Sequence, residues 1–166
     1  MRKLLGSLAA VAFVLLFASP AFAGTATSNM AVSASVSANC TISAGTLAFG
    51  AYDPIVTNAT AALDGTATLT VDCTTGSTAT ITLGQGLNPT AASTAASPAP
   101  QMIDGTNKLA YFLYSDSGRT TVWGNAGVSY TGTGTSGTVT VYGAVTAGQN
   151  EPAGSYTDTV VATITF

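Results

Sequence analysis

A strict alternation over residues 30–42 constrains the fold of this chain more than any other feature. The stretch reads MAVSASVSANCTI, and one parity holds Met30, Val32, Ala34, Val36, Ala38, Cys40 and Ile42. The other parity is mostly Ser, Asn and Thr. Successive side chains of an extended chain point to opposite faces, whereas a helix would scatter these apolar residues around its circumference. The pattern therefore predicts a β-strand with one apolar edge, which either packs on its own core or is lent to another molecule.

The beginning of the chain has the pattern of a secretory signal peptide. Arg2 and Lys3 precede an apolar stretch over residues 4–17, and Ala21-Phe22-Ala23 is a small-x-small cleavage pattern. We expect cleavage after Ala23, export to the periplasm by the Sec route, and a final location at the cell surface or outside the cell. The expected organisation is a signal peptide over residues 1–23, an N-terminal strand segment over 24–39 and one domain over 40–166.

Charge argues against a nucleic-acid partner. The whole chain has four basic and seven acidic residues, a net charge of −3. Without residues 1–23, only Lys108 and Arg119 oppose the seven acids, and the balance becomes −5. A protein that binds a phosphate backbone needs a basic surface, which this composition cannot supply.

Cys40 and Cys73 are the two cysteines of the chain. An isolated pair in an exported protein usually forms a disulfide. Each cysteine shares its parity with apolar neighbours, so both thiols should point into the core. A redox or metal-binding pair would be expected to have a CxxC spacing or nearby histidines, and the chain has neither. We therefore predict a structural disulfide.

The mature chain is a series of short alternating runs separated by Gly, Pro, Asn and Asp. About six runs follow the first segment, near Cys40, Thr66, Thr78, Lys108, Thr138 and Tyr156. This spacing predicts an all-β antiparallel sandwich, and an immunoglobulin-like sandwich has seven strands. The last run ends on Phe166 without a following partner, and an apolar edge strand needs a cover. We expect an incomplete immunoglobulin-like fold, in which the Ala/Ser/Pro-rich residues 91–100 form a surface loop of unassigned role.

Three stretches make the chain recognisable: CTISAGTLAFGAYDP, LAYFLYSDSGRTTVWG and VYGAVTAGQNEPAGSYTDTVVATITF. Together they resemble the spore coat protein U family, which includes the pilin subunits of archaic chaperone–usher fimbriae. The resemblance implies a fold without its final strand. A periplasmic chaperone fills the vacancy first, and the N-terminal strand of the next subunit replaces it at an outer-membrane usher.

The resemblance and the alternation together assign candidate site residues. The donor strand would present Met30, Val32, Ala34, Val36 and Ala38. The acceptor groove would lie between the last strand and the first, lined by Ile42, Leu47, Phe49, Val160, Ala162, Ile164 and Phe166. The expected function is a pilus subunit joined to identical or related subunits by strand donation. The alternative is a secreted adhesive or coat domain that completes its own sheet.

Enzymatic chemistry finds little support in the residues. The chain has no histidine, which excludes a Ser-His-Asp triad and most zinc sites. Gly132, Gly134 and Gly137 match a dinucleotide fingerprint, but a strand pattern follows them, so we predict a hairpin loop. Arg119 could pair with Asp116 at the turn, which would be a structural contact. We predict no catalytic residue, cofactor or metal, and a small hydrolase is the least favoured hypothesis.

Overall fold

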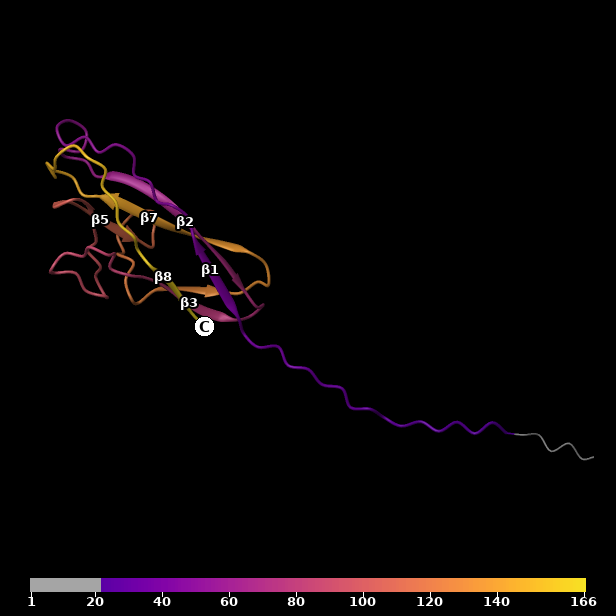
Figure 1. Cartoon of the computed structure of the whole chain (residues 1–166). Helices are drawn as coiled ribbons and strands as arrows, with labels where there is room; N and C mark the ends of the chain where they lie inside the picture. Colours follow the sequence, from indigo (N-terminus) through magenta and orange to yellow (C-terminus); the bar gives the residue numbers. More distant parts are fainter. Residues whose placement is uncertain (1–21) are drawn as a thin grey trace, which may run out of the picture. The chain divides into compact units, whose positions relative to one another are not determined.

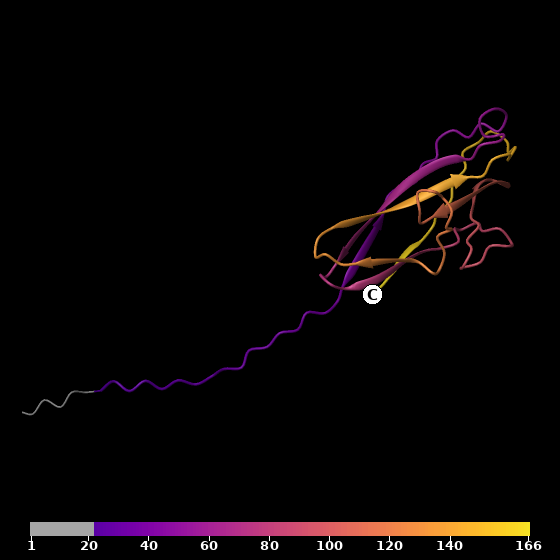
Figure 2. The ribbon, with the colours of Figure 1, turned by 180° about the vertical axis from the view of Figure 1, so that it is seen from behind.

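The computed structural model describes residues 22–166 and shows antiparallel sheets in two layers (Figures 1 and 2). The chain divides into two units, Met1–Ser35 and Val36–Phe166. Nearly all of the predicted signal peptide lies outside the described residues. Residues 22–35 have no regular secondary structure, and their side chains are exposed, including Met30 and Val32.

The second unit contains eight strands in two sheets. The first sheet has the order β1-β2-β7-β5-β4, and the second has the order β6-β3-β8. The strands span β1 Cys40–Ala44, β2 Leu63–Cys73, β3 Thr78–Leu83, β4 Gln101–Asp104, β5 Asn107–Tyr114, β6 Val128–Thr131, β7 Gly137–Val145 and β8 Ala162–Thr165. The described residues contain no helix, so the all-β sandwich predicted from the sequence is confirmed.

Alternation along the strands builds the core between the sheets. In β2 the side chains of Leu69, Val71 and Cys73 are buried, while Thr70 and Asp72 between them are on the outer face. β3 contributes Ile81 from the opposite sheet, and its carbonyl oxygen accepts a 2.9 Å hydrogen bond from Nε1 of buried Trp123. The tryptophan is thus a core residue with its one polar atom satisfied.

The predicted disulfide is confirmed. Cys40 and Cys73 stand opposite each other in the β1–β2 pairing and are bonded through their sulfur atoms. Both are buried in the core cluster. The alternation correctly placed the two thiols on the inner face.

Two of the eight strands were not counted from the sequence. β4 and β6 have four residues each, which is too short to produce a recognisable alternation. The final strand is also shorter than the run that predicted it. It starts at Ala162, and before it Thr157 forms an isolated bridge with Ile103.

Two loops, over residues 132–136 and 91–100, bear on the sequence predictions. Residues 132–136 connect β6 to β7, which belong to different sheets, so the predicted hairpin is wrong and the loop crosses between layers. The low-complexity residues 91–100 form a closed loop. Pro89 bridges Pro100 at its base, and the Ala95 carbonyl accepts a hydrogen bond from the Asn125 N–H at 2.8 Å.

The second unit has an entry end and a far end. The entry end is where the chain enters β1; there the Asn39 carbonyl accepts a 2.9 Å hydrogen bond from the Thr74 N–H. The far end is where β2 begins, and the loop over residues 53–58 precedes it. β2 has 11 residues, so the two ends are about 35 Å apart. Figure 1 shows this loop at the opposite end of β2 from the start of β1 and the C-terminal mark.

Candidate functional site: an open groove beside the last strand

The chain after β1 crosses over the inner face of the first sheet and joins the layer of the second. Leu47 and Phe49 lie directly on Gly65 of β2 and Gly143 of β7. A Cβ atom on Gly143 would come within 2.8 Å of Phe49 Cζ and 2.9 Å of Leu47 Cδ1. The Phe49 ring meets Tyr111 edge-on, with centroids 5.8 Å apart. Glycine at both positions therefore lets this segment pack closely on the sheet.

The segment that leads into β8 lies in the same layer. The Val161 carbonyl accepts a hydrogen bond from the Gly84 N–H at 2.8 Å, and β8 then pairs with β3 over Ala162–Thr165. β8 is the edge strand of its sheet. One side of β8 is therefore paired with β3, while the other faces the segment that follows β1.

A groove separates these two segments. Its first part has a volume of about 390 Å³, and its floor is apolar side chains of the first sheet: Ala67, Leu69, Tyr111, Leu113 and Val141. A second part of about 500 Å³ continues toward the far end, lined by residues 47–52 and 151–154 among others. The two parts share four lining residues, Leu47, Phe49, Met102 and Tyr156. They therefore adjoin along the same pair of walls.

The predicted acceptor residues occupy three kinds of position. Leu47, Phe49, Val160 and Ala162 line the groove. Ile42 and Ile164 are half-buried against the core but do not line it, and Phe166 is 54% exposed. The sequence did not identify the floor, because residues 108–114 are apolar on both parities and the inward face cannot be chosen from the pattern alone.

The predicted donor residues are exposed throughout. The exposed fractions of Met30, Val32 and Val36 are 85%, 86% and 86%, and Ala34 and Ala38 are exposed as well. These side chains bury no apolar surface in this chain. Such a contiguous apolar edge is typical of a surface that another molecule covers.

The carboxylate of Asp158 lies at the groove wall, and both of its oxygen atoms accept hydrogen bonds. Asp158 accepts a hydrogen bond from the Tyr111 hydroxyl at 2.8 Å and another from the Leu87 N–H at 3.0 Å. Burial, and secondarily the Asp158 carboxylate, raises the pKa of Tyr111 above its ordinary range, so the hydroxyl stays protonated and donates. Asp158 and Glu151 are the acidic residues among those lining the two parts of the groove.

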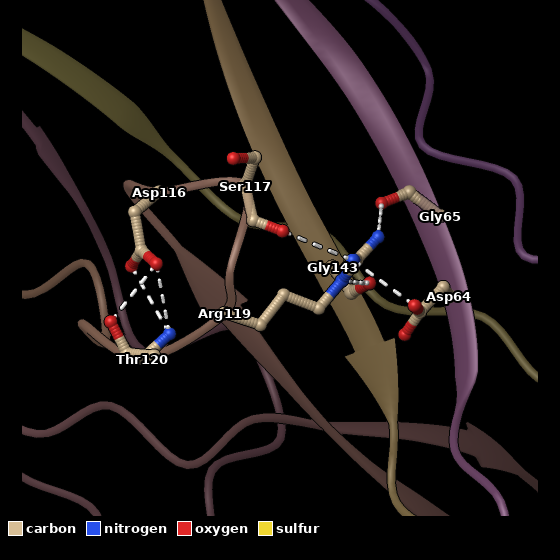
Figure 3. A network of polar contacts seen from close by, with 7 residues as sticks. All are labelled: Asp64, Gly65, Asp116, Ser117, Arg119, Thr120 and Gly143. Carbon is tan, nitrogen blue, oxygen red and sulfur yellow. Dashed lines mark hydrogen bonds and ion pairs between the residues drawn. The ribbon is translucent and has the colours of Figure 1, made fainter.

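Arg119 connects β2 and β7, two of the strands that form the groove floor (Figure 3). Arg119 forms an ion pair with Asp64 at 3.0 Å, and its Nε donates to the Gly143 carbonyl at 3.0 Å. The predicted pair with Asp116 is wrong. The Asp116 carboxylate instead accepts hydrogen bonds from the backbone N–H groups of Thr120 and Thr121, which satisfies it locally.

The described residues show no sign of two other kinds of site. Over residues 22–166 no cluster of three potential metal ligands occurs. The same residues form no helix that is long and apolar enough to cross a membrane.

The groove geometry suits an extended peptide. The wall on the side of β8 is the extended segment over residues 156–160 together with Ala162, and the apolar floor offers space for alternate side chains. Added strands gain affinity from the main chain and specificity from such pockets. An uncharged strand with apolar residues at every second position has the matching chemistry.

Comparison with known proteins places the chain in a family. The family model described as the Spore Coat Protein U domain matches residues 26–163. Protein U of Myxococcus xanthus is 51% identical over 159 residues, covering 89% of each chain. A crystal structure of the CsuC–CsuE chaperone–tip adhesion subunit pre-assembly complex, from the archaic chaperone-usher Csu pili of Acinetobacter baumannii, is similar in fold. Its TM-score is 0.57 at 23% identity, and the match covers 79% of this chain but 40% of that one. The predicted family resemblance is confirmed: the chain belongs to the Spore Coat Protein U domain family.

Proposed function

We propose that this protein is a structural subunit of a surface pilus, polymerised by donating residues 24–39 of one copy to the groove of the next. The single observation that carries the proposal is that one chain has both an open groove and an exposed segment of matching chemistry. It has an open apolar groove beside edge strand β8 and an exposed strand-patterned segment with Met30, Val32 and Val36 on one edge.

Insertion of the segment into the groove has favourable and opposing free-energy terms. Burying Met30, Val32 and Val36 contributes about 1.5–3 kcal/mol each, and each ladder hydrogen bond a net ~0.5–1.5 kcal/mol. Ordering the free segment opposes this by ~1–2 kcal/mol per residue of backbone. The groove adds to the favourable side, because its apolar floor leaves water at the same time.

The charges on the two partners are compatible. Residues 24–39 contain no charged side chain. Of the two acids at the groove, Asp158 is already occupied by hydrogen bonds from the body. Insertion of the segment therefore brings no charged side chain of its own into the groove, and the first part of the groove has no acid other than Asp158.

Donor and acceptor surfaces lie on different parts of one chain, so their contact is heterologous and generates an open filament. The partners in this proposal are identical or related subunits, a periplasmic chaperone that covers the groove before assembly, and an outer-membrane usher. The similarity of fold to the Csu subunit supports this set of partners. The location would be the periplasm in transit and the cell surface afterwards.

A second candidate function is deposition in a coat or matrix, with the segment completing the sheet of its own copy. The 51% identity to Protein U and the name of the family favour it. The two candidates differ in a simple property, since self-completion gives a stable monomer and donation gives a polymer.

Deletion of residues 24–38 tests the proposal. The exported full chain should give a ladder of high-molecular-weight species on an unboiled denaturing gel. The deletion should abolish the ladder and leave chaperone binding intact, because the groove is unchanged. A ladder that persists in the deletion variant would refute strand donation by this segment.

A matched pair of variants tests which edge of the segment is used. Val32→Asp with Val36→Asp places charges on the apolar edge, and burying them should prevent the ladder. Ser33→Asp with Ser37→Asp adds the same charges on the other edge and should preserve it. Equal loss in both variants would mean that the alternation does not determine insertion.

A further inference from the structure

Two large apolar side chains protrude at the far end. Ile55 and Val56 are each 73% exposed, on the loop over residues 53–58. The Asp53 carboxylate accepts hydrogen bonds from both of their backbone N–H groups, at 3.0 and 3.1 Å. The Asn58 N–H closes the loop by donating to the Asp53 carbonyl at 2.8 Å. The loop therefore has a defined conformation with both side chains directed outward.

A buried asparagine ties this loop to the body. Asn58 is 2% exposed; its Oδ1 accepts from the Asp53 N–H at 2.9 Å and its Nδ2 donates to the Ala61 carbonyl at 3.0 Å. The Asn58 carbonyl accepts from the Gly148 N–H at 2.8 Å. Because the loop is already ordered, a partner that covers Ile55 and Val56 does not have to order it, which favours binding.

The direction of β8 determines which end of a neighbouring copy meets this loop. β3 runs from the entry end to the far end, and β8 is antiparallel to it, so β8 runs toward the entry end. A donor strand antiparallel to β8 would then run toward the far end and finish there with Ala38. A donor strand parallel to β8 would instead bring the entry ends of consecutive copies together, where each copy's own segment also leaves. Only the antiparallel arrangement repeats as a head-to-tail filament.

The connection between donor strand and body is too short to hold the copies apart. Asn39 follows Ala38 directly, and its carbonyl accepts a hydrogen bond from the Thr74 N–H of its own body. The entry end of the incoming copy is therefore brought against the far end of the copy that accepts its strand.

We propose that the loop with Ile55 and Val56 packs against the entry end of the next copy of this chain, as a second subunit contact in addition to the donated strand. This contact rests on the proposed polymer. The entry end includes the turn over residues 74–77 and the loop over residues 132–136, which contain only Thr, Gly and Ser. Gly76 and Gly132 join them through a 2.8 Å hydrogen bond. The half-exposed Phe166, after β8, lies at the same end. Covering the turn and the loop with two aliphatic side chains buries no charge.

Intermolecular disulfide formation tests the contact. The full exported chain with Val56→Cys and Thr75→Cys is assembled, oxidised and run on boiled, non-reducing denaturing gels. The expected result is a covalent ladder that survives boiling and disappears on reduction. The matched control is Thr68→Cys with Thr75→Cys, because Thr68 is exposed on β2 between the two ends rather than on the loop. The control should show no such ladder.

The unoxidised, unboiled samples separate the two possible failures. A boiling-sensitive ladder with no oxidised ladder beyond that of the control would overturn the loop contact and leave strand donation standing. Absence of the boiling-sensitive ladder in the unsubstituted chain would overturn the polymer, and the loop contact with it.

Discussion

At the scale of single residues, two glycines determine whether the groove has a wall. Gly65 and Gly143 leave the space in which Leu47 and Phe49 lie on the first sheet. Arg119 binds the carbonyl of Gly143 and the carboxylate of Asp64, so one cation fixes two neighbouring strands beneath that wall. Any side chain at these glycines would displace the segment that forms one side of the groove.

Gly143→Ala tests this packing. The added methyl group would meet Phe49 and Leu47 below van der Waals distance, and overpacking of this kind costs about 1–3 kcal/mol. We expect a lower Tm and weaker strand capture, measured by thermal unfolding and by the unboiled ladder. Gly84→Ala is the control, since the atom nearest to a Cβ atom there, the Val161 carbonyl oxygen, lies at an ordinary contact distance of 3.5 Å. An unchanged Tm in Gly143→Ala would contradict the proposed close packing.

The stability of two turns should depend on pH through the aspartates Asp53 and Asp116. Backbone N–H groups, of Ile55 first and Val56 next, lower the pKa of Asp53 below its ordinary value of 3.8. Those of Thr121 and Thr120 lower the pKa of Asp116 in the same way. A depressed folded-state pKa contributes stability above the unfolded pKa, and that stability is lost as pH falls through the folded pKa. Both turns should therefore stay closed at pH 4 and open only at more acidic pH.

Carboxyl-carbon NMR titration measures these two values directly. Both midpoints should lie below 3.8, and the amide signals of Ile55 and Val56 should move with the Asp53 midpoint. In Asp53→Asn the movement of those amides should vanish while the Asp116 midpoint is unchanged. A midpoint at or above the ordinary value would disprove the hydrogen-bonding account.

At the scale of elements, the Cys40–Cys73 disulfide fastens edge strand β1 to β2. The bond joins residues 33 apart in sequence, and closing such a loop in the unfolded chain stabilises the fold by about 3–4 kcal/mol. The chain continues from β1 into the groove wall at Leu47 and Phe49. The disulfide thus anchors the wall as well as the strand.

Replacing both cysteines by alanine should lower the free energy of unfolding by about 3–4 kcal/mol or more, because two buried sulfur atoms are also removed. Denaturant unfolding monitored through Trp123 fluorescence measures the change. Reduction of the unsubstituted protein should reproduce most of the loss. A double variant as stable as the parent would show that β1 is held by other contacts.

At the scale of the whole molecule, the proposed function requires the groove to bind a strand from outside the body. A synthetic peptide of residues 24–39 should therefore stabilise the variant that lacks residues 24–38. At a concentration about 100-fold above Kd, linkage gives about 2.7 kcal/mol, visible as a rise in Tm. The same peptide with Asp in place of Val32 and Val36 should give no rise. Equal stabilisation by both peptides would contradict specific insertion.

The sequence by itself determined the local features. The period of two along residues 66–73 and 78–83 specified strands and their inward faces, because that alternation has only one extended interpretation. The disulfide followed from two cysteines on inward parities. The short strands β4 and β6 escaped notice, because four residues carry too few repeats to be distinguished from a loop.

Only the tertiary structure decided how distant segments meet. The partner of Arg119 is Asp64, 55 positions away along the chain, and no local spacing favours it over nearby Asp116. The same holds for the groove, whose walls come from residues near Leu47 and Val160 and whose floor comes from three strands between them. Periodicity determines which side of a strand faces inward, but the crossing of one segment over Gly65 and Gly143 depends on packing among residues that the sequence leaves far apart.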